Sequence, residues 1–405
     1  MTLICPFAAL RPVTGRAADV IAPPYDVLSS AEARVRAAGH PLSFLHISKP
    51  EIDLPESTDP HAAEVYARAA SNLQQMLQQG VLKSDDTPCY YIYRMVMGDH
   101  CQTGLVAAAS VAAYDSNRIR KHEFTRPDKE DDRARQIEAL NAQTGPVLLA
   151  YRSQDHVDAL LEAEAANTPE VDLTADDGIR HSLWVVRDSA VIEQITAAFD
   201  AMDALYIADG HHRSAAASRV AASRPGDVEA AGFLAVVFPH RQMQIFDYNR
   251  VVRDLAGMTA EVFLARIAGS FSVSPSADAV RPEGPGIFGL YLAGQWYRLV
   301  IRENLIPDDP VGRLDVSLLA DKLLAPLLGI EDPRRDTRID FVGGIRGLGE
   351  LEKRVDCGDM AAAFSMYPTR MEDLMAVADA GEVMPPKSTW FEPKLADGLV
   401  SLVFD

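Results

Sequence analysis

The chain has 405 residues, of which 48% are apolar and 24% charged, and its formal net charge is −19. This length predicts more than one domain, and the composition is that of an ordinary globular protein. The acidic balance argues against a nucleic-acid partner bound through a basic face and against a cationic segment that binds anionic membranes.

Neither the cysteines nor the first residues indicate a secreted or membrane protein. The four cysteines are scattered without a paired spacing, which argues against a disulfide framework or a zinc ribbon. The start lacks a charged segment followed by a long apolar core, so we expect no secretory signal. No run of 18 apolar residues is present. We therefore expect no membrane-spanning helix and a cytoplasmic location.

In chain order, the N-terminal part predicts short extended segments. Residues 7–13 and 20–27 read as strands, the second bent at Pro23-Pro24, because proline fixes its own backbone and extends the residue before it. Asp26 follows this rigid corner. It has two open interpretations, a substrate contact or the cap of a helix over residues 29–38.

The remainder of residues 1–255 alternates helical patterns with apolar runs of strand length. Two of these runs flank Met97-Gly98-Asp99-His100-Cys101 and predict a hairpin. The alternation predicts an α/β domain with a mixed sheet and flanking helices. The expected strands cover 42–47, 88–97, 102–111, 147–151, 182–186, 204–208 and 233–238, and the expected helices cover 57–80, 128–141, 155–165, 190–202 and 215–222.

The chain from residue 256 to 405 predicts a second, α+β part. A helix over 259–268 leads into a Ser- and Pro-rich stretch at 270–285, which reads as a linker or surface loop. Ala293-Gly294-Gln295 joins two apolar runs as a second hairpin. Further helices are expected over 315–328, 348–354 and 371–380, and strands over 286–292, 296–301, 339–342, 361–367 and 399–404.

The most informative stretch is an apolar run that ends in a polar turn and continues into a run of good helix formers. The turn and the start of the helix contain Asp209, Gly210, His211, His212, Arg213 and Ser214. A helix start carries unpaired N–H groups and the positive end of the helix dipole, which favour an anion. Gly210 permits a close approach, and Arg213 offers a fork of donors shaped for phosphate. The stretch predicts a phosphate-binding turn, with a plain Asp-Gly turn and polar helix cap as the alternative.

Two other polar segments are candidate parts of the site. Lys121-His122-Glu123 precedes a charged helix and suits acid–base chemistry, since His titrates near neutrality and Glu accepts a proton. A surface loop is the alternative for this segment. Lys387, Ser388 and Thr389 lie in a loop stiffened by prolines, which would either reach a phosphate or simply pack.

Five segments resemble the bacterial and archaeal family known as domain of unknown function 1015, and they span nearly the full length. They are residues 22–27, 121–123 with 129–133, 209–213, 339–344 and 384–389. More distantly, Asp209-Gly210-His211-His212-Arg213 resembles the phosphate-binding element of the ParB/sulfiredoxin-like superfamily, some of whose members are kinases acting on free serine. The resemblance implies a ParB/sulfiredoxin-like mixed sheet in the first domain. We expect the tail of the second part to fold back toward the site.

The leading hypothesis is a small-molecule phosphotransferase that uses ATP, ADP or pyrophosphate. The superfamily resemblance implies free serine as the acceptor. Arg213, Lys387 and the helix start would hold the phosphates, Asp209 would help to hold Mg²⁺, and Glu123 or Asp26 would act as the base.

Two other functions stay open. A metal-dependent hydrolase would use Asp209, His211 and His212, with His122 as the only ready further ligand. A nucleotide-binding regulatory protein would keep the phosphate turn without turnover. The expected partner is a small metabolite, and a homodimer is left open as the assembly.

Overall fold

The computed structural model describes residues 2–404, which form two compact units. The first unit contains the chain up to Met243 together with the segment from Pro393 onward, and the second contains Gln244–Glu392. The second unit is thus inserted, along the chain, between the main part of the first unit and its C-terminal segment. A functional division at residue 255 stays a prediction.

The first unit is organised around a nine-stranded mixed sheet. Near its centre, β12 (Gly232–Pro239) runs parallel to β8 (Val147–Tyr151) and antiparallel to β5 (His100–Ser110). Every residue of β8 and β12 is buried, as expected for strands covered on both faces. The mixed α/β class predicted from the sequence is confirmed. The order is β6 (Ile119–Arg120), β11 (Leu205–Asp209), β8, β12, β5, β4 (Tyr90–Met97), β10 (Arg180–Val186) and β9 (Val171–Thr174), with β1 (Ile4–Cys5) also paired to β5.

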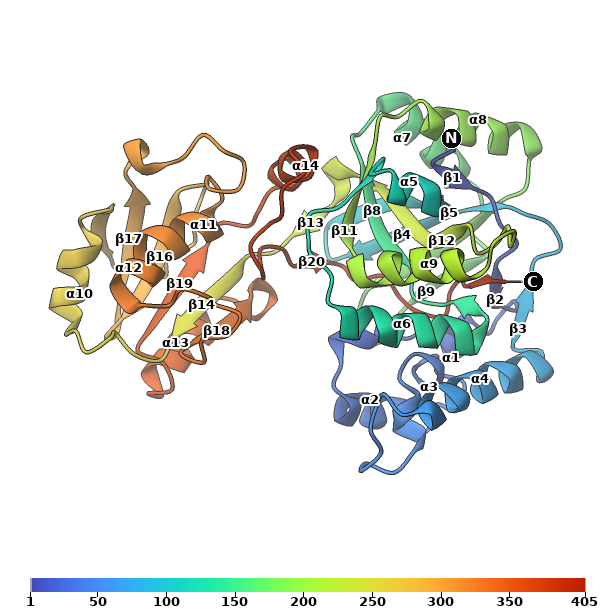
Figure 1. Ribbon diagram of the computed structural model, residues 1–405, viewed down its shortest axis with the longest axis horizontal. Helices are drawn as coiled ribbons and strands as arrows, with labels where there is room; N and C mark the ends of the chain where they lie inside the picture. The colour runs from blue at the N-terminus through green and yellow to red at the C-terminus, as the bar shows by residue number, and fades with distance from the viewer. Residues whose placement is uncertain (1, 405) are drawn as a thin grey trace. The chain divides into compact units, whose positions relative to one another are not determined.

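Helices cover this sheet and complete its apolar core (Figure 1). α6 and α9 lie side by side, and α5 packs against α9. α7 and α8 add Val157, Leu161, Ile195 and Phe199 to the core built on the strands. The bounds are α5 (Val111–Asp115), α6 (Pro127–Leu140), α7 (Asp155–Glu164), α8 (Ser189–Asp200) and α9 (His211–Ser223).

The N-terminal segment builds a second apolar core against α6. Its elements are β2 (Leu10–Pro12), α1 (Ala17–Val20), α2 (Ser30–Ala37), α3 (Leu45–Ser48), α4 (Ala63–Gln78) and β3 (Leu82–Ser84). Ser29 caps α2, because its hydroxyl accepts the Glu32 N–H while the Glu32 carboxylate accepts the Ser29 N–H. The interpretation of Asp26 as this cap is therefore wrong.

Three other expectations for local structure are wrong. Residues 20–27 contain the end of α1 and a 3₁₀ turn at Tyr25–Val27, and residues 42–47 contain most of α3. Short apolar runs cannot separate a buried strand from a buried helical turn. The expected loop at 270–285 contains a strand, β15 (Phe271–Ser276). β15 is an edge strand, a position that tolerates its proline.

The C-terminal segment is held in the first unit by short strand pairings. Ala22 and Asp397 exchange backbone hydrogen bonds, and so do Leu10 and Ser401. β21 (Leu402–Val403) then pairs with β7 (Ala142–Gln143). These contacts bring the residues around Asp397 to the corner that precedes Tyr25.

The second unit contains a six-stranded antiparallel sheet, in the order β15, β17 (Gln295–Ile301), β16 (Ile287–Leu292), β19 (Ala362–Met366), β14 (Tyr248–Val252) and β18 (Ile339–Gly343). β13 (Gln244–Ile245) pairs with β20 (Phe391–Glu392), so the chain enters and leaves this unit side by side. The helices are α10 (Ala260–Ile267), α11 (Asp315–Leu319), α12 (Ala325–Leu328), α13 (Gly349–Asp356) and α14 (Met371–Asp379).

The helix expected over 315–328 is present, with a π-helical turn at Ala320–Leu324 between α11 and α12. Among residues 2–404, no helix has the length and apolar character needed to cross a bilayer.

Candidate functional site

The turn between β11 and α9 has the geometry of an open helix start. Gly210 has φ 100° and ψ 28°, in the left-handed region, and its carbonyl accepts the Ser214 N–H at 3.0 Å. The helix therefore begins at His211, earlier than the run of helix formers that starts at Ala215. The first N–H groups of such a helix have no partner within it, and no side chain at Gly210 caps them. A helix start of this kind can bind an anion, and the phosphate-binding role of the turn stays a prediction.

Arg213 ties this turn to three other segments. Its Nη1 atom donates a hydrogen bond to the Pro146 carbonyl. Its Nη2 atom lies 3.5 Å from Asp26 Oδ2 and 3.8 Å from Asp209 Oδ2. Burial lowers the pKa of Arg213, but Asp26 and Asp209 outweigh that effect and raise it above its usual value. The guanidinium is therefore a permanent positive charge held in the first turn of α9.

Asp209 is held ionised by two cations. Lys394 Nζ, from the C-terminal segment, donates to Asp209 Oδ2 at 3.2 Å. Burial raises the pKa of Asp209, but Lys394 and Arg213 outweigh burial and hold the pKa well below its usual value. An ionised carboxylate beside a helix start is a natural oxygen ligand for a magnesium ion that accompanies phosphates.

His211 and His122 form a buried pair of neutral rings. Their ring centroids lie 4.5 Å apart at an interplanar angle of 86°. The backbone N–H of His122 donates to His211 Nε2 at 3.4 Å. Burial lowers the pKa of His122 to about 4 and that of His211 well below 6.5. His122 therefore does not titrate near neutrality as its sequence context suggested, although its place among the catalytic residues stays a prediction.

Glu123 lies at the same turn. Since His211 Nε2 accepts a hydrogen bond, the proton of the neutral ring belongs on Nδ1, which lies 3.6 Å from Glu123 Oε2. The Glu123 side chain is 56% exposed and so is accessible to a substrate. The His212 ring contacts a different segment, because its Nε2 accepts a hydrogen bond from the backbone N–H of Arg126 at 3.1 Å.

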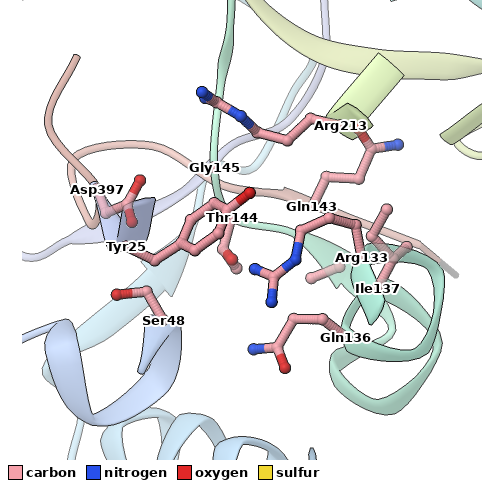
Figure 2. Close-up of a pocket in the computed structure, with 11 residues that line it drawn as sticks. Tyr25, Ser48, Arg133, Gln136, Ile137, Gln143, Thr144, Gly145, Arg213 and Asp397 are labelled. Atoms are coloured by element: carbon pink, nitrogen blue, oxygen red, sulfur yellow. The ribbon is translucent and has the colours of Figure 1, made fainter. Parts of the chain in front are cut away.

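A cavity opens beside Arg213 within the first unit (Figure 2). It contains about 450 Å³ of empty space, part of which is open solvent. Polar side chains from five separate segments line it: Tyr25, Ser48, Arg133, Gln136, Gln143, Thr144, Arg213 and Asp397. Arg133 lies over the Tyr25 ring, 4.0 Å from its centroid. The cavity and the turn between β11 and α9 thus share Arg213.

Lys394 and Asp397 are the residues that sequence reasoning missed. Both follow the segment 384–389, in which the sequence suggests only Lys387, Ser388 and Thr389 as site residues. The adjacent Pro393 and Lys394 were the local pattern that could have drawn attention to Lys394. No local pattern marks Asp397. Their roles depend on pairing with residues near the start of the chain, which local patterns do not reveal.

Lys387, Ser388 and Thr389 belong to the second unit. Ser388 is buried and its hydroxyl donates to the Pro385 carbonyl at 2.5 Å, while Lys387 Nζ lies 5.6 Å from the centre of the Tyr248 ring. Their part in phosphate binding stays a prediction, as does the distance between Lys387 and Arg213.

The donor set does not fit a zinc hydrolase. Within residues 2–404, no group of three or more His, Cys, Asp or Glu side chains is arranged to hold a metal ion. His211 and His212 point to different neighbours, Glu123 and Arg126. Zinc needs at least three protein ligands, so this arrangement argues against the hydrolase alternative.

We expect Gly210→Ala to destabilise the protein by about 1–3 kcal/mol, the usual cost of holding a residue with a side chain in a sparsely populated backbone region. A Cβ atom at Gly210 would lie 3.2 Å from Arg213 Nε and 3.3 Å from Val147 Cα. Gly226→Ala is the matched control, since Gly226 has φ +93° and nothing within 4 Å of its Cβ position. Urea unfolding measures both, and equal losses would show that crowding at Arg213 adds nothing.

The sequence profile of the family described as "Protein of unknown function (DUF1015)" matches residues 4–317, so the chain belongs to that family. The resemblance stated from the sequence is confirmed, although the segments at 339–344 and 384–389 lie beyond the matched residues. A search of curated proteins gave no match.

Several solved structures are similar to the chain at low identity. A mutant free serine kinase in complex with AMP is 13% identical, with 70% of this chain and 90% of that chain covered and a TM-score of 0.36. A different mutant of a free serine kinase, in complex with ADP, is 15% identical, with 70% of this chain and 90% of that chain covered and a TM-score of 0.34. SbnI from Staphylococcus aureus, solved with a C-terminal truncation, is 13% identical, with 73% of this chain and 87% of that chain covered and a TM-score of 0.37. Similarities this weak carry no inference about what this chain does.

Proposed function

We propose that this member of a family of unknown function transfers a phosphoryl group from ATP, ADP or pyrophosphate to a hydroxyl group of a small metabolite. The observation that carries the proposal is the start of α9, where Gly210 leaves the N–H groups uncovered and Arg213 is a fixed charge in the first turn. Such a helix start binds phosphate through its backbone and dipole.

The residues around the turn support the remaining requirements of phosphoryl transfer. The phosphates need cations, and Arg213 is one that the fold holds in place. Mg²⁺ would arrive with the phosphates, and Asp209 would contribute an ionised oxygen to it. Lys394 limits the repulsion between Asp209 and the phosphates, because it pairs with that carboxylate.

The reaction also needs a proton acceptor for the attacking hydroxyl. We propose Glu123, whose carboxylate is exposed at the turn, with Asp26 as the other candidate. The acceptor oxygen would form a bond to the terminal phosphorus as its proton passes to the carboxylate. The bond to the leaving phosphate would break, releasing ADP from ATP, AMP from ADP, or phosphate from pyrophosphate. Free serine is the first acceptor to test, on the motif resemblance stated from the sequence.

Calorimetry with ATP, ADP and pyrophosphate, with and without Mg²⁺, followed by phosphorus NMR with a panel of hydroxyl metabolites, tests the proposal. We expect one donor to bind and to lose its terminal phosphoryl group while a new phosphoester signal appears. Binding without conversion across the panel would favour the regulatory alternative. Absence of binding by all three donors would contradict the phosphate site itself.

A further inference from the structure

We propose that the cavity beside Arg213 binds a small molecule through a protonated primary amine, with the Asp397 carboxylate as its counter-ion and Ser48 as a second acceptor. The inference names the acceptor class of the proposed phosphotransferase, and for the transfer step it rests on that function. The binding step stands on the cavity alone.

Three buried polar atoms in this cavity have no hydrogen-bond partner among the described residues. They are Asp397 Oδ1, Asp397 Oδ2 and Ser48 Oγ. Asp397 is 1% exposed and Ser48 is 7% exposed. In Figure 2 these two residues and Tyr25 lie on one side of the cavity, and Arg133, Gln136 and Ile137 of α6 lie on the other. Buried polar atoms are nearly always paired, so a set of three in one cavity indicates that a ligand supplies the missing donors.

The charges around the cavity identify the kind of donor. Each nearby cation already has a carboxylate partner: Arg133 with Asp132, Arg213 with Asp26, and Lys394 with Asp209. Asp397 is the fourth carboxylate of this set and appears in no such pair. The ionised set therefore holds three positive and four negative charges. One further positive charge would balance it.

An ammonium group matches this requirement in both charge and hydrogen bonding. It has three N–H donors and no acceptor, and the cavity offers it the two Asp397 oxygens and the lone pairs of the Ser48 hydroxyl, whose own proton can turn toward Asp397. A hydroxyl group brings one donor and no charge. A carboxylate brings no donor and would repel Asp397, while the two arginines that might attract it are already paired.

The protonation state of Asp397 in the free protein agrees with a missing cation. Burial raises its pKa to about 7; Arg213 opposes this rise, Asp26 adds to it, and Arg133 and the nearby Ser48 hydroxyl oppose it. The Tyr25 hydroxyl, which also lines the cavity, has a pKa that burial raises above its ordinary value, so it stays neutral. An ammonium group would favour the ionised carboxylate, so binding near pH 7 should release a proton.

The probes for the test are ethanolamine, 1,2-ethanediol and glycolate, which have similar size and carry a positive, zero and negative charge. We expect ethanolamine alone to raise the thermal midpoint of the full-length protein. Asp397→Asn should weaken ethanolamine binding about 10- to 100-fold, the usual worth of a hydrogen bond to a charged group. Asp131→Asn is the matched control, since it removes the same charge from a half-exposed side chain on α6.

Calorimetry of the wild-type protein in buffers of different ionisation enthalpy adds a test that needs no variant. We expect proton release when ethanolamine binds near pH 7, and a smaller release near pH 8.5, where Asp397 is already ionised in the free protein. An equal response to the three probes, preference for glycolate, or no proton exchange near pH 7 would overturn the proposal. Ethanolamine binding without phosphoryl transfer would uphold the cavity and count against the proposed function only.

Discussion

Glu123→Gln is expected to lower the turnover number about 10²–10⁴-fold, the range that a general base contributes, while nucleotide affinity stays nearly unchanged. Glu123 Oε2 lies 3.6 Å from Nδ1 of His211, the first residue of α9, and the side chain is exposed to a substrate. Glutamine keeps the size and the polar contacts of the side chain but cannot take up a proton. Steady-state kinetics and nucleotide calorimetry on the same preparation separate the two effects.

Asp131→Asn is the control for this prediction, because Asp131 lies in the same charged region and pairs with Arg219 at the surface. Its turnover should match that of the wild type. Equal losses of nucleotide affinity and turnover in Glu123→Gln would instead give Glu123 a structural or metal-holding role. A large loss of turnover in Asp26→Asn, with Glu123→Gln unaffected, would assign the base to Asp26.

Arg213→Ala is expected to weaken binding of the phosphate ligand about 10- to 100-fold, since a hydrogen bond to a charged group contributes about 1.5–3 kcal/mol. The guanidinium sits in the first turn of α9, is anchored by the Pro146 carbonyl, and keeps its charge because Asp26 and Asp209 face it. Calorimetry with ATP, ADP and pyrophosphate measures the loss.

Arg219→Ala is the matched control on the same helix. Arg219 is half-exposed and pairs with Glu130 and Asp131, so its removal should leave ligand binding unchanged. Because Arg213→Ala also leaves Asp209 and Asp26 with less positive charge nearby, circular dichroism must show that the variant is folded. Arg213→Lys keeps the charge but loses the forked pair of donors. Its affinity for the phosphate ligand should therefore lie between that of Arg213→Ala and that of the wild type. Wild-type affinity in a folded Arg213→Ala variant would refute the phosphate site, and the phosphotransferase proposal with it.

The two histidines of the motif have different tasks in this structure. His211 is buried and neutral, and its ring contacts link His122 and Glu123 to the helix start. His212 accepts the Arg126 N–H just before α6. Both rings therefore connect the segment at residues 121–126 to the turn between β11 and α9. This explains why two adjacent histidines occur at a position where neither forms part of a metal cluster among the residues described.

Local patterns in the sequence were sufficient for most of the fold. Continuous apolar runs predicted β8 and β12, because strands covered on both faces need no alternation. The hairpin between β4 and β5 follows from turn chemistry, which acts over a few residues. The prediction of a phosphate-binding turn rests on the same kind of local pattern, because Asp209, Gly210 and Arg213 are neighbours along the chain.

Only the tertiary structure decided where α9 begins and which charges surround it. α9 starts at His211 because Gly210 adopts a left-handed conformation at the end of a buried strand, which helix propensity does not predict. Lys394 reaches Asp209 across 185 positions of the chain, and Asp397 faces the cavity because its backbone pairs with Ala22. Such contacts depend on the free energy of burying charges together in one folded unit. Each residue taken alone in the sequence carries no sign of that.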